Sequence, residues 1–284
     1  MTRRVWLEVA LNGAWSRARQ PLMPVTVEQV VADAVACVRA GAAVVHFHAY
    51  DAKGKPCEDV EFYASAIDGI RSQCDAIVYP TIGFTPDDPE SPRRYEPLRE
   101  LARRGLLEWI PIDPGSINVN RYEAVAQRQP GRFYLNSDGH IRRGLEFCAE
   151  ARLVPTFAIY EPGFARLGAA LTASTPGIRT PLYRFMFTAG RAWGFPAQEY
   201  ALAAYRALLQ GEAPDAPWMI AGHEVDLRGL IQATVASGGH VRVGLEDAPY
   251  GTELRNIDWV ESAVTAIGRS GGAPATASEI RAAG

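Results

Sequence analysis

The sequence contains very little lysine. Lys and Arg together make up 29 of the 284 residues, and the only lysines are Lys53 and Lys55, separated by one glycine. A lysine that forms an imine with a carbonyl substrate normally lies desolvated in a pocket. Both lysines instead belong to a charged loop-like stretch, so the sequence argues against a Schiff-base aldolase.

Long apolar runs, paired cysteines and an excess of charge are also missing. No stretch approaches the roughly 20 apolar residues that span a bilayer, and the N-terminal MTRRVWLEVALNG is too short and strand-like for a signal peptide. Cys37, Cys57, Cys74 and Cys148 show no Cys-x-x-Cys spacing, which favours reduced thiols. A net charge of -3 gives no case for nucleic acid or membrane binding. We therefore expect a cytoplasmic protein with small-molecule partners.

Short β-rich runs alternate with helical patterns along most of the chain, which is typical of βα units around a parallel sheet. The chain lacks a Gly-x-Gly-x-x-Gly after its first strand and any P-loop, which disfavours a doubly wound open sheet. Eight units without a linker predict one TIM barrel over residues 1–270, followed by a tail, 271–284, that ends in a frayed helix. The predicted strands are 5–11, 43–48, 76–82, 107–113, 154–160, 182–188, 218–222 and 241–247, with an extra short strand at 133–136. Predicted helices include 27–40, 59–72 and one around 139–151, and Thr26 with Gln29 forms a capping box before the first.

The second predicted strand carries two histidines one residue apart, in VVHFHAYDAKGKP. Side chains at i and i+2 of a strand point to one face, about 6 to 7 Å apart along the strand. In a barrel, the inward face at the carboxyl end of a strand is where active sites form. His46 and His48 could therefore converge on one metal ion, although a single histidine there is more often a hydrogen-bonded core residue.

The last predicted strand ends in two adjacent carboxylates, in HVRVGLEDAPY. Consecutive strand residues face opposite ways, so Glu246 and Asp247 should have different roles. With the histidines, Glu246 would complete a set of two imidazoles and one carboxylate, which suits catalytic zinc or the facial triad of non-haem iron. Asp247 would remain free as a base. The alternative is a solvated pair or a helix N-cap.

These stretches, with ALNGA, VPTFAIYEPG and SGGHVRVGLEDAPY, resemble the β-keto acid cleavage enzyme family in register from Val5 to about Gly268. The resemblance implies a TIM barrel, zinc bound by His46, His48 and Glu246, and Asp247 as base. It also implies a homo-oligomer, a tetramer or dimer. The implied reaction passes an acyl group between a β-keto acid and acetyl-CoA, giving acetoacetate and a new acyl-CoA.

That chemistry requires few groups from the protein. A β-keto carboxylate can chelate a cation through its ketone and carboxylate oxygens, and zinc as a Lewis acid then stabilises the enolate formed on proton loss. Asp247 is our candidate for the base, and Thr81 lies where the family has a serine that helps to bind the keto acid. Thr81 could equally be a β-branched residue that fills a strand end. The candidate substrate-binding residues, all near predicted strand ends, are Asn12, Trp15, Gly83, Asp113 and His223.

Several polar positions of the family's pocket differ here. Trp15 stands where better-studied members have a glutamate, and Thr156 and Ala158 replace a Glu-x-Glu. These changes predict an apolar pocket and a substrate with an uncharged alkyl or aromatic tail. The arginine that partners the base aligns with Val225, so the base is expected to lack its cation. The possible substitutes are His223, which could also bind substrate or metal or be a simple loop residue, Glu224 and Arg228.

The remaining histidines and arginines are assigned structural or surface roles. His240 lies six residues before Glu246, so the two side chains would face the same side of the predicted strand, but His240 lies deep towards the floor of the barrel. His140 is expected on an exposed turn. A solvated helix face, or a site for CoA phosphates, is expected for four arginines: Arg93, Arg94, Arg103 and Arg104.

Two other functions stay open. The same barrel and metal ligands would serve a metal hydrolase or a non-haem iron oxygenase, which metal analysis and oxygen uptake would distinguish. A divergent, non-catalytic barrel that binds a keto acid would show binding without formation of an acyl-CoA.

Overall fold

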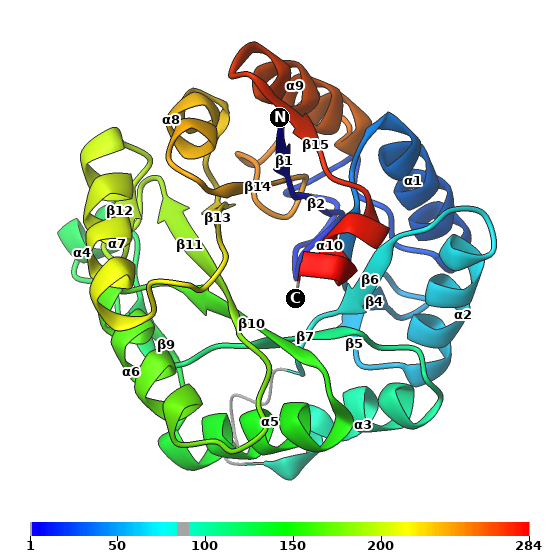
Figure 1. Cartoon of the computed structure of the whole chain (residues 1–284), viewed down its shortest axis with the longest axis horizontal. Coiled ribbons are helices and arrows are strands. Elements are labelled where there is room, and N and C mark those ends of the chain that lie inside the picture. Colours follow the sequence, from blue (N-terminus) through cyan, green and yellow to red (C-terminus); the bar gives the residue numbers. More distant parts are fainter. Residues whose placement is uncertain (1, 84–90, 284) are drawn as a thin grey trace.

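A computed structural model describes residues 2–83 and 91–283 of the chain as an α/β barrel (Figure 1). Its eight strands are β2 (Leu7–Ala10), β3 (Val44–Phe47), β6 (Ile77–Pro80), β7 (Trp109–Ile112), β10 (Val154–Ile159), β11 (Leu182–Thr188), β13 (Trp218–His223) and β14 (His240–Val243). They pair in parallel in the order β6-β3-β2-β14-β13-β11-β10-β7. The end strands β6 and β7 lie beside each other, but no strand pairing joins them within the described ranges. The predicted TIM barrel is confirmed, in a nearly closed form.

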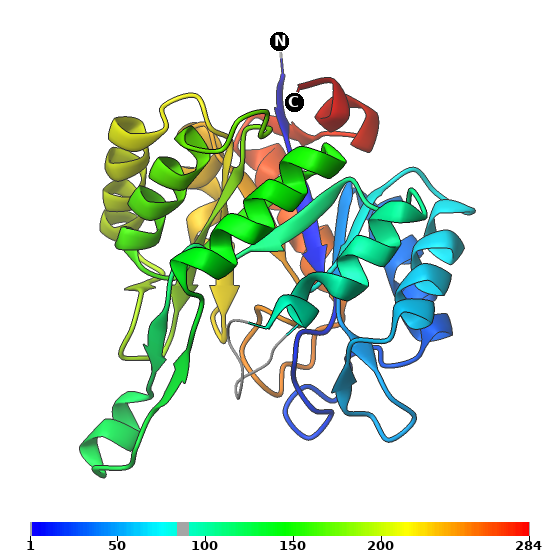
Figure 2. The same cartoon turned by 90° about the horizontal axis from the view of Figure 1, so that it is seen from below.

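Helices surround the strands on the outside of the barrel (Figure 1). They are α1 (Val27–Ala40), α2 (Val60–Arg71), η1 (Pro92–Tyr95), α3 (Glu96–Arg103), α5 (Asp138–Ala151), α6 (Pro162–Ala173), α7 (Glu199–Glu212), η2 (Arg228–Leu230), α8 (Ile231–Ala236) and α9 (Asn256–Arg269). Two further helices, α4 (Tyr122–Ala126) and α10 (Ala277–Ala283), lie apart from this ring (Figure 2). The short strands outside the barrel are β1 (Arg3–Val5), β4 (Ala49–Tyr50), β5 (Pro56–Cys57), β8 (Ile117–Val119), β9 (Arg132–Tyr134), β12 (Phe195–Pro196) and β15 (Gly272–Pro274). Within the described residues no helix is both long and apolar enough to cross a membrane.

Local sequence signals account for the first helices. Thr26 caps α1, since its hydroxyl accepts from the backbone N–H of Gln29 at 3.3 Å. The Gln29 side chain accepts instead from the N–H of Val25 at 3.0 Å, one residue before the cap. Asp59 caps α2 by accepting from the N–H groups of Glu61 and Phe62. The caps therefore fix where the chain turns from the mouth of the barrel into its outer helices.

The predicted first and last strands have different bounds in the structure. Residues 5–11 divide between β1, which pairs with β15 outside the barrel, and β2 within it. The last strand ends at Val243, because Gly244 adopts φ +134° and a Cβ there would lie 2.2 Å from the carbonyl oxygen of Ala10. Residues 244–248 form a turn closed by the N–H of Ala248 on the carbonyl of Gly244. Glu246 and Asp247 are therefore turn residues, not strand residues.

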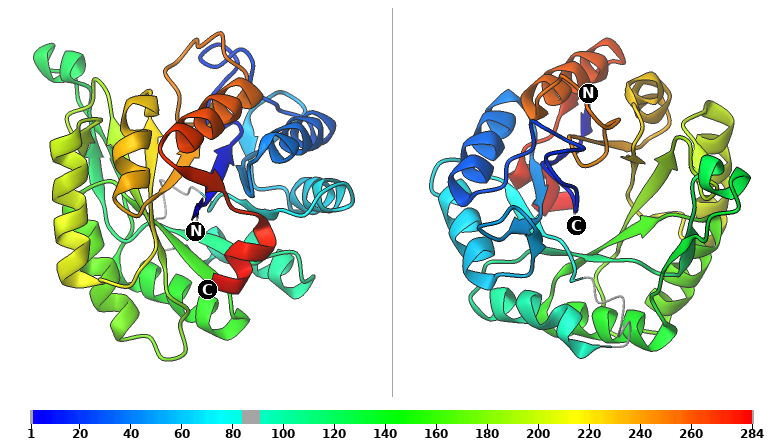
Figure 3. Two further views of the ribbon diagram at one scale, coloured as in Figure 1. Left: turned by 45° about the horizontal axis from the view of Figure 1, so that its top comes forward. Right: turned by 180° about the vertical axis from the view of Figure 1, so that it is seen from behind.

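The C-terminal segment closes the floor of the barrel. Strand β15 pairs with β1, and α10 lies across the amino-terminal ends of the barrel strands (Figures 1 and 3). Ile280 of α10 packs into an apolar cluster with floor residues such as Ile77 and Leu182. Arg281 binds Glu108 and Asp75 through ion pairs. The tail thus packs against the barrel as an ordered element.

An arm built from β8, α4 and β9 projects from the barrel on the side away from both termini (Figure 2). The loop after β11 runs beside the arm where β8 leads into α4: the Tyr122 N–H donates to the carbonyl of Gly190, and the Ala192 N–H donates to the carbonyl of Asn120. The arm therefore joins the mouth of the barrel through the loop after β11.

Two predicted surface residues are buried. His140 lies in α5 with 1% of its area exposed and stacks on Tyr95 with ring centroids 4.6 Å apart. Arg94 is also buried, and its Nε donates to the carbonyl of Gly83 at 2.9 Å. The expectations of an exposed turn and a solvated helix face are therefore wrong for these two residues. The loop carbonyl of Gly83 pairs with the Arg94 guanidinium, whereas His140 is covered by the Tyr95 ring although neither of its ring nitrogens has a hydrogen-bond partner among the described residues.

Candidate active site

His46 and His48 lie at the mouth of the barrel, where β3 ends. Their rings are 5.3 Å apart between centroids. His46 Nε2 lies 3.4 Å from Glu246 Oε2, and His48 Nε2 lies 3.5 Å from Glu246 Oε1. One ligand atom from each of the three residues falls within 4.8 Å of the others. The structure thus brings the three predicted metal ligands together, from strand β3 and from the turn after β14.

Asn12 fixes the backbone at His48. Its side-chain oxygen accepts from the N–H of His48 at 2.8 Å, and its Nδ2 donates to the carbonyls of His48 and Pro24. These bonds occupy the amide at both ends. Asn12 was predicted to bind substrate, and its contacts in the structure orient a candidate metal ligand instead.

The chemistry of these donor atoms suits a divalent metal ion. His48 Nε2 and Glu246 Oε2 are buried and have no hydrogen-bond partner within the described ranges. Burial lowers the pKa of His46 well below its ordinary value, so its imidazole stays neutral, the form that binds metals. Two imidazole nitrogens and a carboxylate oxygen leave further coordination positions open to a substrate.

Glu246 and Asp247 diverge, as adjacent carboxylates with different roles should. Glu246 faces the two histidines, whereas Asp247 Oδ2 accepts from the backbone N–H of Gly222 at 3.0 Å. The divergence comes from the turn after Gly244, since neither residue belongs to a strand. Asp247 therefore sits beside the metal-ligand set without belonging to it.

Arg242 of β14 holds Asp247 in place. Its Nη2 donates to Asp247 Oδ1 at 2.7 Å and its Nε to Oδ2 at 2.9 Å, a two-point contact that fixes the carboxylate plane. The same Nη2 lies 3.0 Å from Glu246 Oε1. The expectation that the candidate base lacks a cationic partner is wrong. The alignment of that partner with Val225 misplaced it, because Val225 contributes only a backbone N–H to the carbonyl of Asp247.

The three proposed substitutes are used elsewhere. Arg228 forms an exposed ion pair with Asp226. Glu224 is buried between Arg121 and Arg191 and pairs with both. His223 packs at the rim of the mouth and makes no contact with Asp247 among the interactions described here.

A charged layer lies beneath the candidate base. Glu8 Oε1 accepts from Arg242 Nη1 at 3.0 Å and from the hydroxyl of Tyr79 at 2.6 Å. Arg184 Nη1 in turn donates to the Tyr79 oxygen at 2.9 Å. Sequence reasoning missed this layer, although the signal was present. Each of these four residues interrupts an apolar strand at an inward-facing position, one layer below the mouth.

The two carboxylates are tuned in opposite directions. Burial raises the pKa of Asp247 above its ordinary value, with Arg242 opposing the shift. Burial would also raise the pKa of Glu246, but the nearby charge of Arg242 and the two imidazoles hold it well below its usual range. Glu246 thus keeps its negative charge, as a metal ligand would require, while Asp247 has the greater proton affinity that a general base would require.

An aromatic rim borders the metal ligands. Trp15 Nε1 donates to the carbonyl of Glu246 at 2.9 Å, and its ring meets His223 and Tyr250 edge-on, each 5.2 Å away. The Trp193 ring also lies near His223, with ring centroids 5.2 Å apart. Burial lowers the pKa of His223 to about 4, so it is neutral at pH 7. The structure therefore places predicted substrate residues Trp15 and His223 together beside Glu246.

The other predicted substrate residues lie at neighbouring strand ends. Thr81 follows β6 and is partly exposed, with its N–H on the carbonyl of Phe47. Asp113 follows β7 and accepts from the Tyr134 hydroxyl at 2.5 Å, while burial raises its pKa. Gly83 contacts Arg94 through backbone atoms. No described contact joins these residues to the metal ligands.

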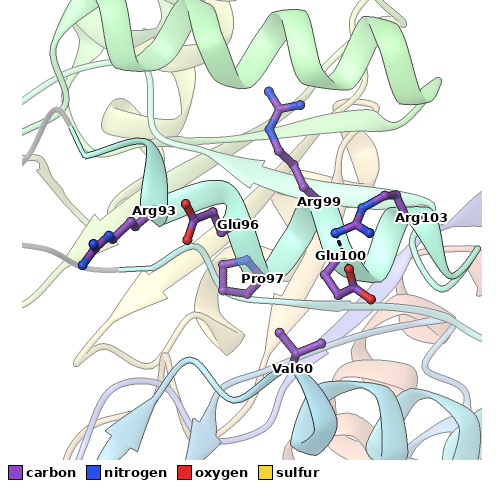
Figure 4. A pocket seen from close by; sticks show the side chains of 7 residues that line it. All are labelled: Val60, Arg93, Glu96, Pro97, Arg99, Glu100 and Arg103. Atoms are coloured by element: carbon purple, nitrogen blue, oxygen red, sulfur yellow. Dashed lines mark ion pairs between the residues drawn. The ribbon is translucent and has the colours of Figure 1, made fainter.

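A separate surface pocket of about 540 Å³ lies on the outside of the barrel beside α3 (Figure 4). Two of its arginines form ion pairs with acidic residues: Arg103 pairs with Glu100, and Arg99 lies 3.5 Å from Glu150. Arg93 is exposed at its edge. This pocket is distant in the fold from the aromatic rim and does not belong to the candidate active site.

Comparison with known proteins agrees with this geometry. Residues 4–283 match the family model described as beta-keto acid cleavage enzyme. The chain is 25% identical over 260 residues to a 3-keto-5-aminohexanoate cleavage enzyme of Fusobacterium nucleatum, covering 88% of this chain and 85% of that one. It is 26% identical over 252 residues to a 3-oxoadipate:acetyl-CoA acetyltransferase of Cupriavidus necator, covering 87% and 81%.

Among solved structures, a binary complex of ObcA with oxaloacetate shares the fold. The TM-score is 0.70 at 15% identity, and the match covers 92% of this chain and 67% of that one. The family match spans nearly the whole chain, and the residues that first suggested it meet at one end of the barrel. The chain belongs to the β-keto acid cleavage enzyme family.

Proposed function

We propose that this protein condenses a β-keto acid with acetyl-CoA to give acetoacetate and a new acyl-CoA, using zinc held by His46, His48 and Glu246. The observation that carries the proposal is the meeting of these three side chains beside an arginine-held Asp247. Relatives named for acetyl-CoA-dependent transfers from 3-oxoadipate and 3,5-dioxohexanoate support the same reaction type.

The residues divide the work between binding and proton transfer. Zinc, when bound, would supply Lewis-acid polarisation of the ketone and carboxylate oxygens of the keto acid. Asp247 would take the proton from the carbon between those oxygens, and its raised pKa suits it to that task. Arg242 keeps the carboxylate oriented before the proton moves. Thr81 is proposed as a hydroxyl contact for the keto acid, and Asp113 and Gly83 as lining at adjacent strand ends.

The substrate tail is proposed to be uncharged. Inward-facing Ala158, Met186 and Ala221 form a small apolar cluster with Tyr160. Thr156 is occupied one layer deeper, where its hydroxyl donates to the carbonyl of Ile110 at 3.1 Å. Trp15 adds a ring at the rim. A charged tail placed against this wall would lose its hydration without gaining a partner there.

The test is to incubate zinc-loaded protein with acetyl-CoA and a panel of β-keto acids, and to measure acetoacetate and new thioesters by mass spectrometry. At least one acid with an uncharged tail should give both products. Binding without either product would instead support a non-catalytic keto-acid-binding barrel.

Two histidines and one carboxylate also form the ligand set of non-haem iron oxygenases, and a metal hydrolase could use the same site. Metal analysis of protein purified without chelators, together with an oxygen-uptake assay, distinguishes these functions. Iron with oxygen consumption would replace the acyl-transfer proposal.

We also propose a cytoplasmic homo-oligomer, a dimer or tetramer, with the arm as a contact between copies. Four of the large apolar side chains that are exposed in the described residues lie on the arm or directly after it: Tyr122, Val125, Phe133 and Leu135. Exposed apolar groups gathered on a projecting hairpin are typical of subunit contacts. The four cysteines are all free, as in reducing compartments. Light scattering of wild type and of a Tyr122→Ser, Phe133→Ser double variant tests the assembly, since the variant should dissociate.

A further inference from the structure

The rim beyond Trp15 holds polar groups that the proposed chemistry does not use. Trp193 is 6% exposed and the Arg191 side chain is 9% exposed, yet Trp193 Nε1 and Arg191 Nε have no hydrogen-bond partner among the described residues. His223 Nε2 is buried and unpartnered in the same region. A buried polar group without a partner costs about 1 to 3 kcal/mol, so three together require a reason.

These groups form one cluster that reaches the metal ligands. The His223 ring lies 5.2 Å from both Trp193 and Trp15, and Trp15 Nε1 binds the carbonyl of Glu246. Arg191 joins the cluster through Glu224, whose carboxylate lies 4.0 Å from His223 Nε2. A substrate held at Glu246 with its tail along the rim would therefore extend towards Trp193 and Arg191.

The cluster offers N–H donors more than it offers charge. Glu224 is buried and forms ion pairs with both Arg191 and Arg121. The positive charge of Arg191 is therefore balanced within the protein. Glu224 is held at φ +58°, an uncommon conformation for a residue with a side chain, by these two contacts from separate segments. The turn after β13 is thereby fixed, and His223 with it. Besides His223 Nε2, the indole N–H of Trp193 and the Nε–H of Arg191 remain without a hydrogen-bond partner among the described residues.

The chemistry that satisfies such donors is a neutral oxygen. Between the metal ligands and the cluster, the inner wall is apolar at Ala158, Met186 and Ala221. A ligand that matches the whole path has a keto acid at one end, apolar carbons in the middle and an oxygen at the far end. We propose that the substrate is a β-keto acid whose tail ends in a neutral hydroxyl or keto oxygen, bound by Trp193 and Arg191. This inference rests on the proposed function and names its substrate class.

The test compares substrates and variants together. Four acids serve as probes: 3-oxohexanoate, which lacks the distal oxygen; its 5-hydroxy derivative; its 6-hydroxy derivative; and 3-oxoadipate, which ends in a carboxylate. In the wild type, one hydroxylated acid should exceed 3-oxohexanoate in kcat/KM by about ten-fold, the scale of one well-placed buried hydrogen bond. Trp193→Phe keeps the ring and removes the N–H, so it should abolish that preference by lowering kcat/KM for the hydroxylated acid by about ten-fold, with a much smaller effect on 3-oxohexanoate.

Trp259 provides a matched control. Its Nε1 is also buried and unpartnered, but it lies on α9 outside the barrel, with Arg228 packed over its ring at 4.7 Å. Trp259→Phe makes the same chemical change and should leave the substrate preference intact.

The results separate this inference from the proposed function. If the wild type prefers 3-oxohexanoate or 3-oxoadipate, or if Trp193→Phe reduces turnover of every acid alike, the inference is overturned while β-keto acid cleavage stands. If no acid in the panel gives acetoacetate and a thioester, the proposed function fails and this inference fails with it.

Discussion

His240 and Arg242 lie two residues apart on β14 and both face the interior of the barrel, but they belong to different environments. His240 stacks on Trp6 at the floor, with centroids 4.2 Å apart, and its Nδ1 accepts from the Trp6 N–H. Burial lowers its pKa to about 3, so it stays neutral. Arg242, one layer nearer the mouth, is charged and binds three carboxylates.

The contrast shows how one barrel separates stability from chemistry. At the floor, α10 packs against an apolar cluster, and the buried imidazole of His240 is neutral and paired within the chain. Near the mouth, charges are buried only in mutually paired sets, and atoms of the metal ligands and of the rim remain unpartnered. Changes at the mouth should therefore affect turnover first, and changes at the floor should affect folding first.

The largest effect is expected at the candidate base. Asp247→Asn keeps the shape of the side chain but cannot accept the proton, so turnover should fall by about 10²-fold to 10⁴-fold. Metal content should stay at the wild-type level. His46→Ala should lose both metal and turnover, because it removes a ligand. Full metal occupancy in the His46 variant, measured by elemental analysis, would contradict the ligand assignment.

Next in size is the loss of Arg242. Arg242→Gln leaves Asp247 as a buried carboxylate without its cation and leaves Glu8 with only the more distant Arg184, at 3.7 Å, which should lower the free energy of unfolding by about 3 to 5 kcal/mol. Turnover should fall by at least about 10-fold to 100-fold, since the base loses its orientation. Arg228→Gln is the control, because Arg228 forms an exposed pair whose loss should cost about 1 kcal/mol or less. If the two variants lost equal amounts of stability and turnover, the proposed role of Arg242 in holding Asp247 would be wrong.

A floor variant should show the opposite behaviour. Ile280→Ala removes a side chain packed under the barrel and should cost about 2 kcal/mol of unfolding free energy or more. The kcat/KM of the folded enzyme should remain at the wild-type value, because α10 lies at the amino-terminal ends of the strands (Figure 2), whereas the candidate metal ligands follow the carboxyl ends of β3 and β14. Leu167→Ala, at a partly exposed position, should change neither quantity by a comparable amount. A large loss of kcat/KM in the Ile280 variant would show that floor and mouth are coupled.

The smallest effect concerns pH. The pKa of His240 is lowered to about 3 in the folded state, against about 6.5 when unfolded, so the unfolded chain binds the extra proton. The contribution of this group to stability is therefore complete above pH 6.5 and is lost as the pH falls towards 3. His240→Asn retains an acceptor for the Trp6 N–H but does not titrate. Urea unfolding at pH 7 and pH 5 should show a smaller loss of stability in the variant than in wild type.

Much of the architecture could be predicted from local pattern. The eight strands and the caps at Thr26 and Asp59 follow from apolar periodicity and capping chemistry, which act over a few residues. The sequence predicted the ends of the strands less accurately. Gly244 ends β14 early because only glycine can approach the Ala10 carbonyl so closely, a constraint imposed by a neighbouring strand.

At the site, the sequence indicated His46, His48 and Glu246 because strand alternation places the two histidines on one face and the family resemblance implies the same three ligands. It did not reveal the cation that holds Asp247. Arg242 is part of the same segment, HVRVGLEDAPY, but the alignment placed the partner at Val225. Arg242 and Asp247 are five residues apart, and their side chains meet only because the chain turns at Gly244. The Trp193 and Arg191 cluster was missed for a similar reason, since its members contact each other through loops from different βα units.

The sequence by itself determined the barrel, its strand count and the residue types available for metal binding, because hydrophobic periodicity and strand parity are properties of short segments. Only the tertiary structure decided which charges meet. Burial brings Arg242 to Asp247, Arg191 to Glu224 and His140 to Tyr95, and it also makes an unpaired polar group costly. Pairings of that kind depend on positions far apart in the chain, and no local pattern specifies them.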